Sequence, residues 1–556
     1  MIPEIPTNIP LAVGLDTGGT FTDAVLVEMK GGRVLKTAKH PTTHHRLGLG
    51  ISRALEAVTA GVPPERVRRM AFSTTLATNA VVEGQGARVG LLVIGDVKTF
   101  DLPVVSVRYV DGGHDHLGRE VRPLDLEALT DALAELAGHV DAYVVAGAMS
   151  MENPTHEQVA TRAIELTDPK PVFASHQVAG RAGLKARAAT EVLHARLLPI
   201  ISGFVEELRG LIRRRGFAGE VRMIRGDAEA IDLDAVIRRA AATAASGPAA
   251  TAFFGARSAL AKRALVVDVG GTTTDITLIE DGRPAVSSEG SWIGSWRTHI
   301  DAVEMDTVGI GGDSLTILDR SGTLRIGPCR ATPLAMAPEC PDPGRWIGPE
   351  ARARCVFLAD ERDEADGADS PILNFLRREK AVPAADLVAR LRLSQIGVER
   401  ELEGLARLGT VRLSGFTPTD ALHALGKLDI GDGNRSMAAA KALGALRSQS
   451  PEAFCEDVLR ETRIRLRRAM LNVAFRKRTG KGVDACFPER GDDQMLAVSF
   501  ALKIPIVALG AAARLLLPEV AEELGAQIVF PPYYEVGNAL GAVWIALEAE
   551  EKGSLP

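Results

Sequence analysis

Hydrophobic and polar positions along the chain form short apolar runs that alternate with longer segments of helical periodicity. Val89–Ile94 and Ala142–Ala148 are apolar runs with the length and β-branched content of buried strands. Leu124–Ala137 and Thr155–Thr167 instead repeat apolar residues at a spacing of three and four, which predicts amphipathic helices. Strands that alternate with helices in this way predict an α/β fold with layered, partly parallel sheets.

Two apolar runs end in the same motif. In Leu11–Glu28 a buried strand ends at an acid, a glycine turn follows and a second strand begins, and Arg263–Gly282 repeats this order. The corresponding residues are Asp16, Gly18, Gly19, Thr20, Thr22 and Asp23 in the first copy and Asp268, Gly270, Gly271, Thr272, Thr274 and Asp275 in the second. A separation of about 250 residues is too long for a solenoid repeat and fits one domain copied into two halves.

The motif has the composition of an anion-binding turn. Glycines without a Cβ let backbone N–H groups close on an anion, and the threonine hydroxyls add further donors. An acid at the strand end, such as Asp16 or Asp268, can hold Mg²⁺ or orient a nucleophile. A single motif of this kind is equally compatible with an anion-binding turn and with an ordinary hairpin turn. Its recurrence predicts one phosphate chain held from two sides.

Two other segments gather polar groups. The hydroxyl residues Ser73–Thr75, followed one turn later by Thr78 and Asn79, either cap a helix or point several neutral donors in one direction. Gly309–Ser314, with the sequence G-I-G-G-D-S, is either a third turn that faces phosphate or substrate or a tight loop between strands. In the first case Asp313 is an available carboxylate.

Small residues mark two further positions. Ile504–Leu509 is a buried strand that ends at Gly510 and Ala511, where a small-residue turn lets a flat adenine or ribose lie against the backbone. Ser246-Gly247-Pro248 is predicted to end the helix expected over Asp232–Ala245.

The histidine-rich segment His114-Asp115-His116 allows a metal site or an exposed turn. No second ligand pair follows at zinc-like spacing, so the turn is favoured.

The character of the chain changes after residue 336. Clustered prolines and the acidic run Asp360–Asp369 predict an exposed linker, and Ser370–Gly415 predicts a helical insert whose three short helices and strand resemble a winged helix. Glutamates on its last helix are unsuited to a DNA groove, which favours a structural or partner-binding role. The predicted domains are 1–180, the N-terminal lobe with the first turn; 181–336, the start of the second lobe with the second turn; 337–415, the linker and insert; and 416–556, the remainder of the second lobe with the nucleoside-binding turn.

Composition narrows the class of protein. The chain is 46% hydrophobic and 24% charged, as expected for a globular protein, and its net charge of −6 gives no general attraction to nucleic acid or an anionic membrane. Five cysteines without a C-x-x-C pair indicate a reducing compartment. The N-terminus lacks a signal-peptide pattern, and the most apolar late window, Ile504–Leu517, is interrupted by Arg514 and too short to span a bilayer. These features predict a cytoplasmic protein.

Taken in order, the motifs resemble those of two nested groups of proteins. The paired D-x-G-G-T hairpins, with a late small-residue turn, resemble the ATPase superfamily of actin, Hsp70 chaperones and sugar kinases. More narrowly, the chain resembles the ATP-dependent hydantoinase/5-oxoprolinase family, which includes subunits of acetone and acetophenone carboxylases. The segments that carry this resemblance are Gly14–Asp23, Ser73–Ala80, Ser246–Ala250, Asp268–Asp275, Thr307–Ser314, Thr417–Leu422 and Glu535–Ala542.

The resemblance implies two actin-like (ribonuclease H-like) lobes with an ATP cleft between them. It also implies phosphorylation of an amide or ketone oxygen with ATP and Mg²⁺, for opening of a cyclic amide such as a hydantoin or 5-oxoproline or for ketone carboxylation. Asp16 and Asp268 would then hold Mg²⁺ or orient the nucleophile. The phosphates would contact Thr17, Gly18, Gly19, Thr20, Gly270, Gly271, Thr272 and Thr273, the nucleoside would contact Gly510 and Ala511, and the substrate would contact Thr74, Thr75, Asn79 and Asp313.

The chain departs from the family pattern at three points. It stops soon after Glu535–Leu547, where larger relatives continue, which puts the usual contact with a hydrolase-type subunit in doubt. Asp313 replaces a glycine of the commoner G-x-G-G-G-S, which alters the expected substrate, and the insert of about 45 residues before Thr417 is atypical. Two other functions stay open: a non-catalytic ATP switch that regulates a partner, and a small-molecule kinase. Homo-oligomerisation is compatible with all three.

Overall fold

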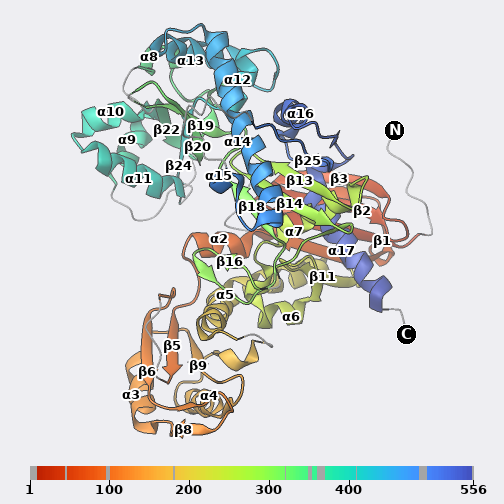
Figure 1. Ribbon diagram of the computed structural model, residues 1–556, viewed down its shortest axis with the longest axis vertical. Helices are drawn as coiled ribbons and strands as arrows, with labels where there is room; N and C mark the ends of the chain where they lie inside the picture. Colours follow the sequence, from red (N-terminus) through yellow and green to blue (C-terminus); the bar gives the residue numbers. More distant parts are fainter. Residues whose placement is uncertain are drawn as a thin grey trace. The chain divides into compact units, whose positions relative to one another are not determined.

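The computed structural model describes residues 9–19, 21–43, 47–95, 101–178, 182–287, 289–319, 321–348, 353–359, 370–407, 410–486 and 498–553 (Figure 1). The chain divides into two compact units. Unit 1 comprises Met1–Arg257, Arg283–Glu304 and Val536–Pro556, and unit 2 comprises Ser258–Gly282 and Met305–Glu535. This division differs from the predicted domains, because residue 180 lies inside unit 1 and the end of the chain belongs to unit 1.

The central sheet of unit 1 contains the first glycine turn. Strands β1, β2 and β3 form an antiparallel meander, and β4 and β11 add parallel strands on the other side of β1. In the order β12-β11-β4-β1-β2-β3 the strands are Ala230–Asp232, Glu220–Ile224, Val67–Thr74, Leu11–Thr17, Phe21–Glu28 and Val34–Pro41. Side chains alternate between the two faces of a strand, so Leu11, Val13 and Leu15 enter one apolar core while Gly14 and Asp16 point to the opposite face.

Helices cover both faces of this sheet. Helix α1 (Leu47–Thr59) packs on β2 and β3, and α17 (Gly537–Gly553), near the C-terminus of the chain, packs on β1 and β4. Figure 1 shows α17, in blue, beside the red strand β1. The approach is very close, since a Cβ added at Gly14 would lie 2.0 Å from the carbonyl oxygen of Ala539. Only glycine at position 14 lets α17 reach the sheet.

Unit 1 contains a second sheet in which all pairs of strands are parallel. In the order β10-β9-β5-β6 its strands are Val172–Ala174, Ala142–Gly147, Val89–Ile94 and Ser106–Val110. Helices α3 (Leu126–Leu136) and α4 (Thr155–Thr167) share one apolar core with it, and α5 (Leu184–Arg214) shares another. Parallel strands that are covered on both faces are expected to be continuous apolar runs in the sequence, and these strands are such runs.

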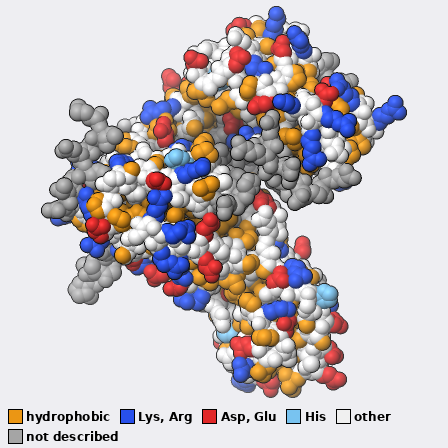
Figure 2. Space-filling view, turned by 180° about the vertical axis from the view of Figure 1, so that it is seen from behind, with side chains coloured by type: hydrophobic (Ala, Val, Ile, Leu, Met, Phe, Trp, Pro, Cys, Tyr) orange, Lys and Arg blue, Asp and Glu red, His pale blue; other side chains and the backbone are white. Residues whose placement is uncertain are grey.

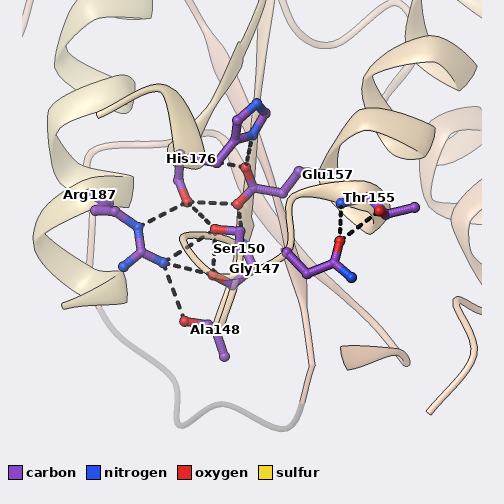
Figure 3. A network of polar contacts seen from close by, with 9 residues as sticks. Gly147, Ala148, Ser150, Thr155, Glu157, His176 and Arg187 are labelled. Atoms are coloured by element: carbon purple, nitrogen blue, oxygen red, sulfur yellow. Dashed lines mark hydrogen bonds and ion pairs between the residues drawn. The ribbon is translucent and has the colours of Figure 1, made fainter. Parts of the chain in front are cut away.

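Helix α5 is the long core helix of unit 1. Among the described residues it is the one helix whose length and composition would allow it to cross a membrane, and 67% of its most apolar window is buried inside the protein. A buried polar network ties it to β9 and α4 (Figure 3). Arg187 of α5 donates to the carbonyl oxygen of Gly147 at 2.8 Å, and the carboxylate of Glu157 accepts from Gly147 N at 2.6 Å and from Ser175 Oγ at 2.7 Å. Burial opposes the charge on Glu157, but hydrogen bonds from His176 and Ser175 outweigh it and lower the pKa of the carboxyl group.

The main sheet of unit 2 repeats the plan of the first sheet. β13 pairs antiparallel with β14, and β14 pairs antiparallel with β18, while β25 and β26 add parallel strands beside β13. These strands are β18 (Met305–Val308), β14 (Thr274–Glu280), β13 (Ala264–Val269), β25 (Ile506–Leu509) and β26 (Ile528–Val529). They correspond in order to β3, β2, β1, β4 and β11. The duplication predicted from the two motifs therefore extends to five strands of each sheet, with β12 and β15 outside the correspondence.

The apolar core of unit 2 combines this sheet with α12 (Pro418–Ala424), α13 (Gly433–Leu446), α14 (Pro451–Thr479) and α16 (Ala513–Glu523). Many arginines of the basic helix α14 form ion pairs, as expected for a helix face in contact with solvent. Arg463 pairs with Glu519, and Arg467 pairs with Glu523. Basic and acidic side chains are also mixed on the face of the molecule that Figure 2 shows, so no single-sign surface for nucleic acid stands out there.

The remaining described elements are short. In unit 1 they are α2 (Leu76–Val82), α6 (Leu233–Arg238), α7 (Ser246–Ser258), β7 (Gly113–His114), β8 (Glu120–Arg122), β15 (Arg283–Pro284), β16 (Trp292–Ile293) and β17 (Trp296–Arg297). In unit 2 they are β19 (Ser314–Leu318), β20 (Leu324–Arg330), α8 (Pro343–Trp346) and α15 (Val483–Cys486).

The insert of unit 2 forms a small sheet with its own helical core. Its strands, in the order β21-β24-β22-β23, are Thr332–Pro333, Val411–Gly415, Arg354–Leu358 and Ala381–Pro383. The three predicted helices are present as α9 (Pro371–Glu379), α10 (Ala384–Leu391) and α11 (Gln395–Arg407). β22 lies in the segment that was predicted to be an exposed linker, so the linker prediction was wrong for residues 354–358. The acidic run 360–369 is outside the described residues, and the likeness to a winged helix stays a prediction.

Ser246-Gly247-Pro248 does not end a helix. These residues begin α7, and the helix predicted over Asp232–Ala245 is α6 followed by a short 3₁₀ turn, Ala240–Thr243. Proline is tolerated in the first turn of a helix, where its missing N–H has no partner to lose, so Pro248 is compatible with a helix start.

We predict that Gly541→Ala lowers the free energy of unfolding by about 1–3 kcal/mol, the usual cost of overpacking. A Cβ at Gly541 of α17 would lie 1.9 Å from the carbonyl oxygen of Ala250 in α7, so the two helices must separate. Thermal and urea unfolding measure the change. Gly203→Ala is the matched control: Gly203 lies in helix α5 with open space around it, and alanine there should be neutral or stabilising. Equal stability of both variants would contradict the prediction.

Candidate functional site

The first glycine turn is a tight hairpin between β1 and β2. The N–H of Gly18 donates to the carbonyl oxygen of Phe21 at 3.0 Å, and Thr42 Oγ1 donates to the carbonyl oxygen of Gly18 at 2.8 Å. No atom lies within 4 Å of a Cβ placed on Gly19, so the outer side of the turn is open. Thr20 lies outside the described residues. An open backbone of this kind is available to an anion.

Asp16 ends β1 beside this turn and is held by two donors. Ser73 Oγ donates to one carboxylate oxygen at 2.6 Å, and Asn538 Nδ2 donates to the other at 3.2 Å. Asp16 is only 1% exposed, and this burial raises its pKa against the opposing effect of the two hydrogen bonds. The first helical turn of α7 also approaches this carboxylate, because a Cβ at Gly247 would lie 3.4 Å from Asp16 Oδ1. The acid is therefore fixed by residues from β4, α7 and α17.

The predicted hydroxyl cluster lies against the same turn. Thr75 donates its backbone N–H to the carbonyl oxygen of Thr17 at 3.1 Å, and Asn79 Nδ2 donates to Thr75 Oγ1 at 3.3 Å. Thr74 has a structural role: its Oγ1 accepts from the N–H of Leu76 at the start of α2, and its backbone is bonded to Ser246. Thr75 is the N-cap of α2 and makes no side-chain cap hydrogen bond, so the cluster does not cap the helix in the usual way, whereas Thr75 and Asn79 do lie beside the turn.

One donor of the first turn is unused. Thr17 is 3% exposed, and its Oγ1 has no hydrogen-bond partner among the described residues. Buried hydroxyl groups are normally bonded, so this oxygen is available to a further group at the turn.

The second glycine turn repeats the geometry of the first. The N–H of Gly270 donates to the carbonyl oxygen of Thr273 at 2.9 Å, and Asp268 faces Asp275 across the hairpin as Asp16 faces Asp23. The G-I-G-G-D-S loop packs directly on this turn: Gly312 N donates to Gly270 O at 3.1 Å.

Asp268 lies beside the small-residue turn that follows β25. A Cβ on Gly510 would lie 2.4 Å from Asp268 Oδ1, and Gly510 has a φ of +86°, so glycine is required there on both counts. Ala512 N donates to the carbonyl oxygen of Val269 at 3.3 Å. Unit 2 therefore brings together its second glycine turn, Asp268, Gly510 and Ala511 at the same end of the sheet.

Asp313 is the acid that replaces a glycine of the commoner motif, and it lies against the second turn. Its N–H donates to Gly271 O at 2.6 Å, and its Oδ2 would lie 2.4 Å from a Cβ on Gly271. Burial raises the pKa of Asp313, while Arg330 at 3.6 Å and Thr419 lower it. The loop connects β18 with β19, as a tight loop between strands would, and it also packs on the second glycine turn.

The carboxylates can accommodate Mg²⁺ only together with another ligand. Mg²⁺ in nucleotide sites is commonly held by one or two carboxylates, water and phosphate oxygens. Asp16 and Asp268 each supply a carboxylate beside a turn, whereas no group of three or more His, Cys, Asp or Glu side chains suited to a metal occurs in the part of the chain that the structure describes. The residues therefore fit Mg²⁺ that arrives with a phosphate chain.

The segment His114–His116 is a turn. The Asp115 carboxylate accepts from the N–H groups of Leu117 and Arg119 at 2.9 Å each, which closes the turn between β7 and β8.

Some contacts and residues of these sites were not predicted from the sequence. Ser73 belongs to the predicted hydroxyl cluster and Asn538 lies in a matching segment, but nothing local shows that either meets Asp16. Asp420 of the T-P-T-D-A-L segment is a buried structural centre: it caps α12 with Thr417 and accepts from Ser436 Oγ at 2.6 Å. A carboxylate directly after Thr-Pro-Thr is a helix-capping signal, which could have identified this role.

Comparison with known proteins identifies the family. The sequence model of the hydantoinase/oxoprolinase N-terminal region matches residues 12–167, and that of hydantoinase/oxoprolinase matches residues 187–432. Together they match well over half of the chain, which therefore belongs to the hydantoinase/oxoprolinase family.

The individual relatives are distant and longer. The acetophenone carboxylase gamma subunit of Aromatoleum aromaticum is 29% identical over 67% of this chain and 56% of its own length. The caprolactamase subunit alpha of Pseudomonas jessenii is 28% identical over 57% of this chain and 50% of its own length. The crystal structure of the ATP-dependent caprolactamase from that organism has the same fold, with a TM-score of 0.67 and 22% identity over 96% of this chain and 70% of that one. The chain thus spans about half the length of the curated relatives it matches.

We predict a pH effect from Asp23, which is 7% exposed and paired with Lys39 at 3.0 Å. Burial raises its pKa to about 6, above the ordinary 3.8, so the folded state binds the proton more tightly than the unfolded state. The resulting stabilisation is complete below pH 4 and is lost as the pH rises through 6. The difference in unfolding free energy between the wild type and Asp23→Asn should therefore change between pH 4 and 7 by on the order of 2 kcal/mol. A difference that is constant over this range would contradict the shift. Asp141→Asn, at an exposed pair with Arg88, is the control and should change little in this window.

Proposed function

We propose that this chain uses ATP to activate the oxygen of a cyclic amide or a ketone, for hydrolysis of the amide or carboxylation of the ketone. The observation that carries the proposal is the pair of equivalent Asp-Gly-Gly turns, each at the end of the same strand of an equivalent sheet. Family membership supports it, since the named relatives are a caprolactamase and an acetophenone carboxylase. The two sheets also support an actin-like ATPase fold in which the turns face one nucleotide.

The turns would share the phosphate chain. Backbone N–H groups of Gly18 and Gly19, with Thr17 and Thr20, and those of Gly270 and Gly271, with Thr272 and Thr273, would contact phosphate oxygens. Asp16 and Asp268 would hold Mg²⁺, which supplies neutralisation of the phosphate charge when it is bound. The unused Oγ1 of Thr17 is one donor that such an anion would satisfy.

Activation of an amide or ketone oxygen suits this kind of site. That oxygen is a weak nucleophile, so the site must contribute position and charge neutralisation more than a strong base. Asp16, fixed by Ser73 and Asn538, is preorganised to orient groups without moving. Thr75 and Asn79 beside the first turn and Asp313 beside the second are the proposed substrate contacts, with Thr74 holding α2 in place. Gly510 and Ala511 would lie against the nucleoside.

Other features of the assembly are also proposed. The relatives are named as subunits, which supports a hydrolase- or carboxylase-type partner chain, and the insert around α9–α11, read as a winged-helix-like module, is the proposed partner-binding part. A homo-oligomer is compatible with this arrangement, and we place the protein in the cytoplasm.

ADP release from ATP and Mg²⁺ tests the function. We expect release to rise at least tenfold over the basal rate with one of hydantoin, 5-oxoproline, caprolactam or acetophenone, assayed with and without a co-expressed partner chain. The activated oxygen accepts the phosphoryl group, so its presence should speed ATP consumption. Tight ATP binding without stimulation by any of these compounds would contradict the proposal and favour an ATP switch.

Asp268→Asn should lower stimulated turnover by about 10²–10³-fold, because a charge positioned at the phosphoryl group acts chiefly in the transition state. ATP binding, measured by calorimetry, should change much less. Asp429→Asn, at an exposed site of the same unit, is the control and should keep full activity. Near-normal turnover of the Asp268 variant would contradict the role of the second turn.

A further inference from the structure

Unit 1 contains a cavity of about 790 Å³ that none of the residues assigned above lines. Sites for small molecules typically measure about 300–1,000 Å³. The cavity lies between α5 and the hairpin of β16 and β17. It is lined by Asp101, Leu102, Ala182, Gly183, Lys185, Ala186, Ala189, Glu289, Trp292, Ser295, Trp296, Arg297 and His299.

Two walls of the cavity suit a flat ring. Ala186 of α5 is partly exposed and presents a small, smooth side chain to the cavity, whereas Ala189, three residues further on, is buried in an apolar core. The hairpin opposite carries Trp292 and Trp296. Trp292 is 68% exposed, and a large indole left in contact with water is a common mark of a binding surface. Indole faces bind rings by stacking at little cost in side-chain entropy.

The charges at the cavity balance, which favours a neutral occupant. Two cations and two anions line it, Lys185 and Arg297 against Asp101 and Glu289. Arg297 and Glu289 are already paired at 2.7 Å. An anion such as a phosphate would gain no excess of positive charge here, in contrast to the open backbone N–H groups of a glycine turn.

The cavity is held rigidly. Trp296 packs against both apolar cores of unit 1 that meet at α5. The N–H of His299 donates to Thr190 Oγ1 of α5 at 2.8 Å, which joins the hairpin segment to the helix. Arg187, on the same helix, is anchored in the buried network of Figure 3. A preformed site loses little entropy when a ligand binds.

Helix α2 connects the cavity with the first glycine turn. Its start is fixed by the hydrogen bond from Thr75 to Thr17. Near its end, the side chain of Val81 lies next to Gly294 of the hairpin, as does that of Trp296. A Cβ placed on Gly294 would be 3.2 Å from each of these two side chains. At 1.5 Å per residue, seven helical residues span about 10 Å. Helix α2 therefore begins at the first glycine turn and ends beside the hairpin that lines the cavity.

We propose that this cavity binds a neutral, ring-bearing amide or ketone, with the ring between Ala186 of α5 and Trp292. The proposal rests on the function proposed above, since it gives the same class of compound a binding site in unit 1 that is separate from the proposed contacts at Thr75, Asn79 and Asp313. Neutrality excludes ATP itself as the occupant.

Calorimetric titration of the intact chain, without ATP, with caprolactam and with acetophenone tests the site. We expect saturable binding of at least one of them, about tenfold weaker in Trp292→Ala through loss of the stacked indole. Ala186→Phe should weaken binding at least as much by filling the slot. Tyr109→Ala removes an exposed aromatic ring of unit 1 that does not line the cavity, and should leave the affinity unchanged. Inorganic phosphate at millimolar concentration should not compete.

The outcomes separate this proposal from the proposed function. Binding that Trp292→Ala and Ala186→Phe leave unchanged, or that phosphate abolishes, would overturn the cavity assignment even if ADP release is stimulated. The absence of binding by both compounds would overturn it as well. Binding that depends on both residues but stimulates no ADP release would support the cavity and count against the proposed function.

Discussion

The structure depends on close backbone approach around the two glycine turns. At Gly14 and Gly541 of unit 1, an added Cβ would lie 2.0 and 1.9 Å from a carbonyl oxygen of a neighbouring helix. At Gly311 and Gly510 of unit 2 the corresponding distances, to Gly270 O and Asp268 Oδ1, are both 2.4 Å. No side chain fits at such distances, so glycine at these positions is what lets helices and loops reach the strand ends. The packing of α17 on β1 also brings Asn538 to Asp16, and open space is left at Gly19 of the first turn.

The sequence was sufficient to predict the parts of the site that are local. A hairpin is made by neighbouring residues, and its apolar strands, acid and glycines all lie within about 18 residues, so both turns and their duplication could be read directly. The helices of the insert and the parallel strands around α5 were likewise visible, because their periodicity or continuous apolar character is a local property.

Other parts depend on contacts between distant residues and could not be read from pattern. The two donors to Asp16 come from positions 57 and 522 residues away, and their presence there follows from the packing of β4 and α17 on β1. β22 lies in a proline-rich region that is followed by an acidic run, so the local composition does not indicate a strand. The strand is stabilised by pairing with β24, which is distant in the sequence. Ser246-Gly247-Pro248 was misread for a different reason: the same small and breaking residues are typical of a helix end and of a helix start, and tertiary packing against Thr74 decides between them.

The equivalent turns differ in one respect that bears on their roles. The first turn has an open backbone and the hydroxyl of Thr17, which has no hydrogen-bond partner among the described residues, whereas the second turn carries the carboxyl group of Asp313 against Gly271. The opposing charge of Arg330 lies 3.6 Å away on a side chain that is 56% exposed, where solvent weakens it. A charged Asp313 would repel phosphate at Gly271. Burial, however, moves the pKa of this acid upward and so disfavours its charged form relative to an exposed carboxyl group. Asp313 therefore suits the neutral reactant better than the phosphate chain, which is the physical reason to group it with the proposed substrate contacts.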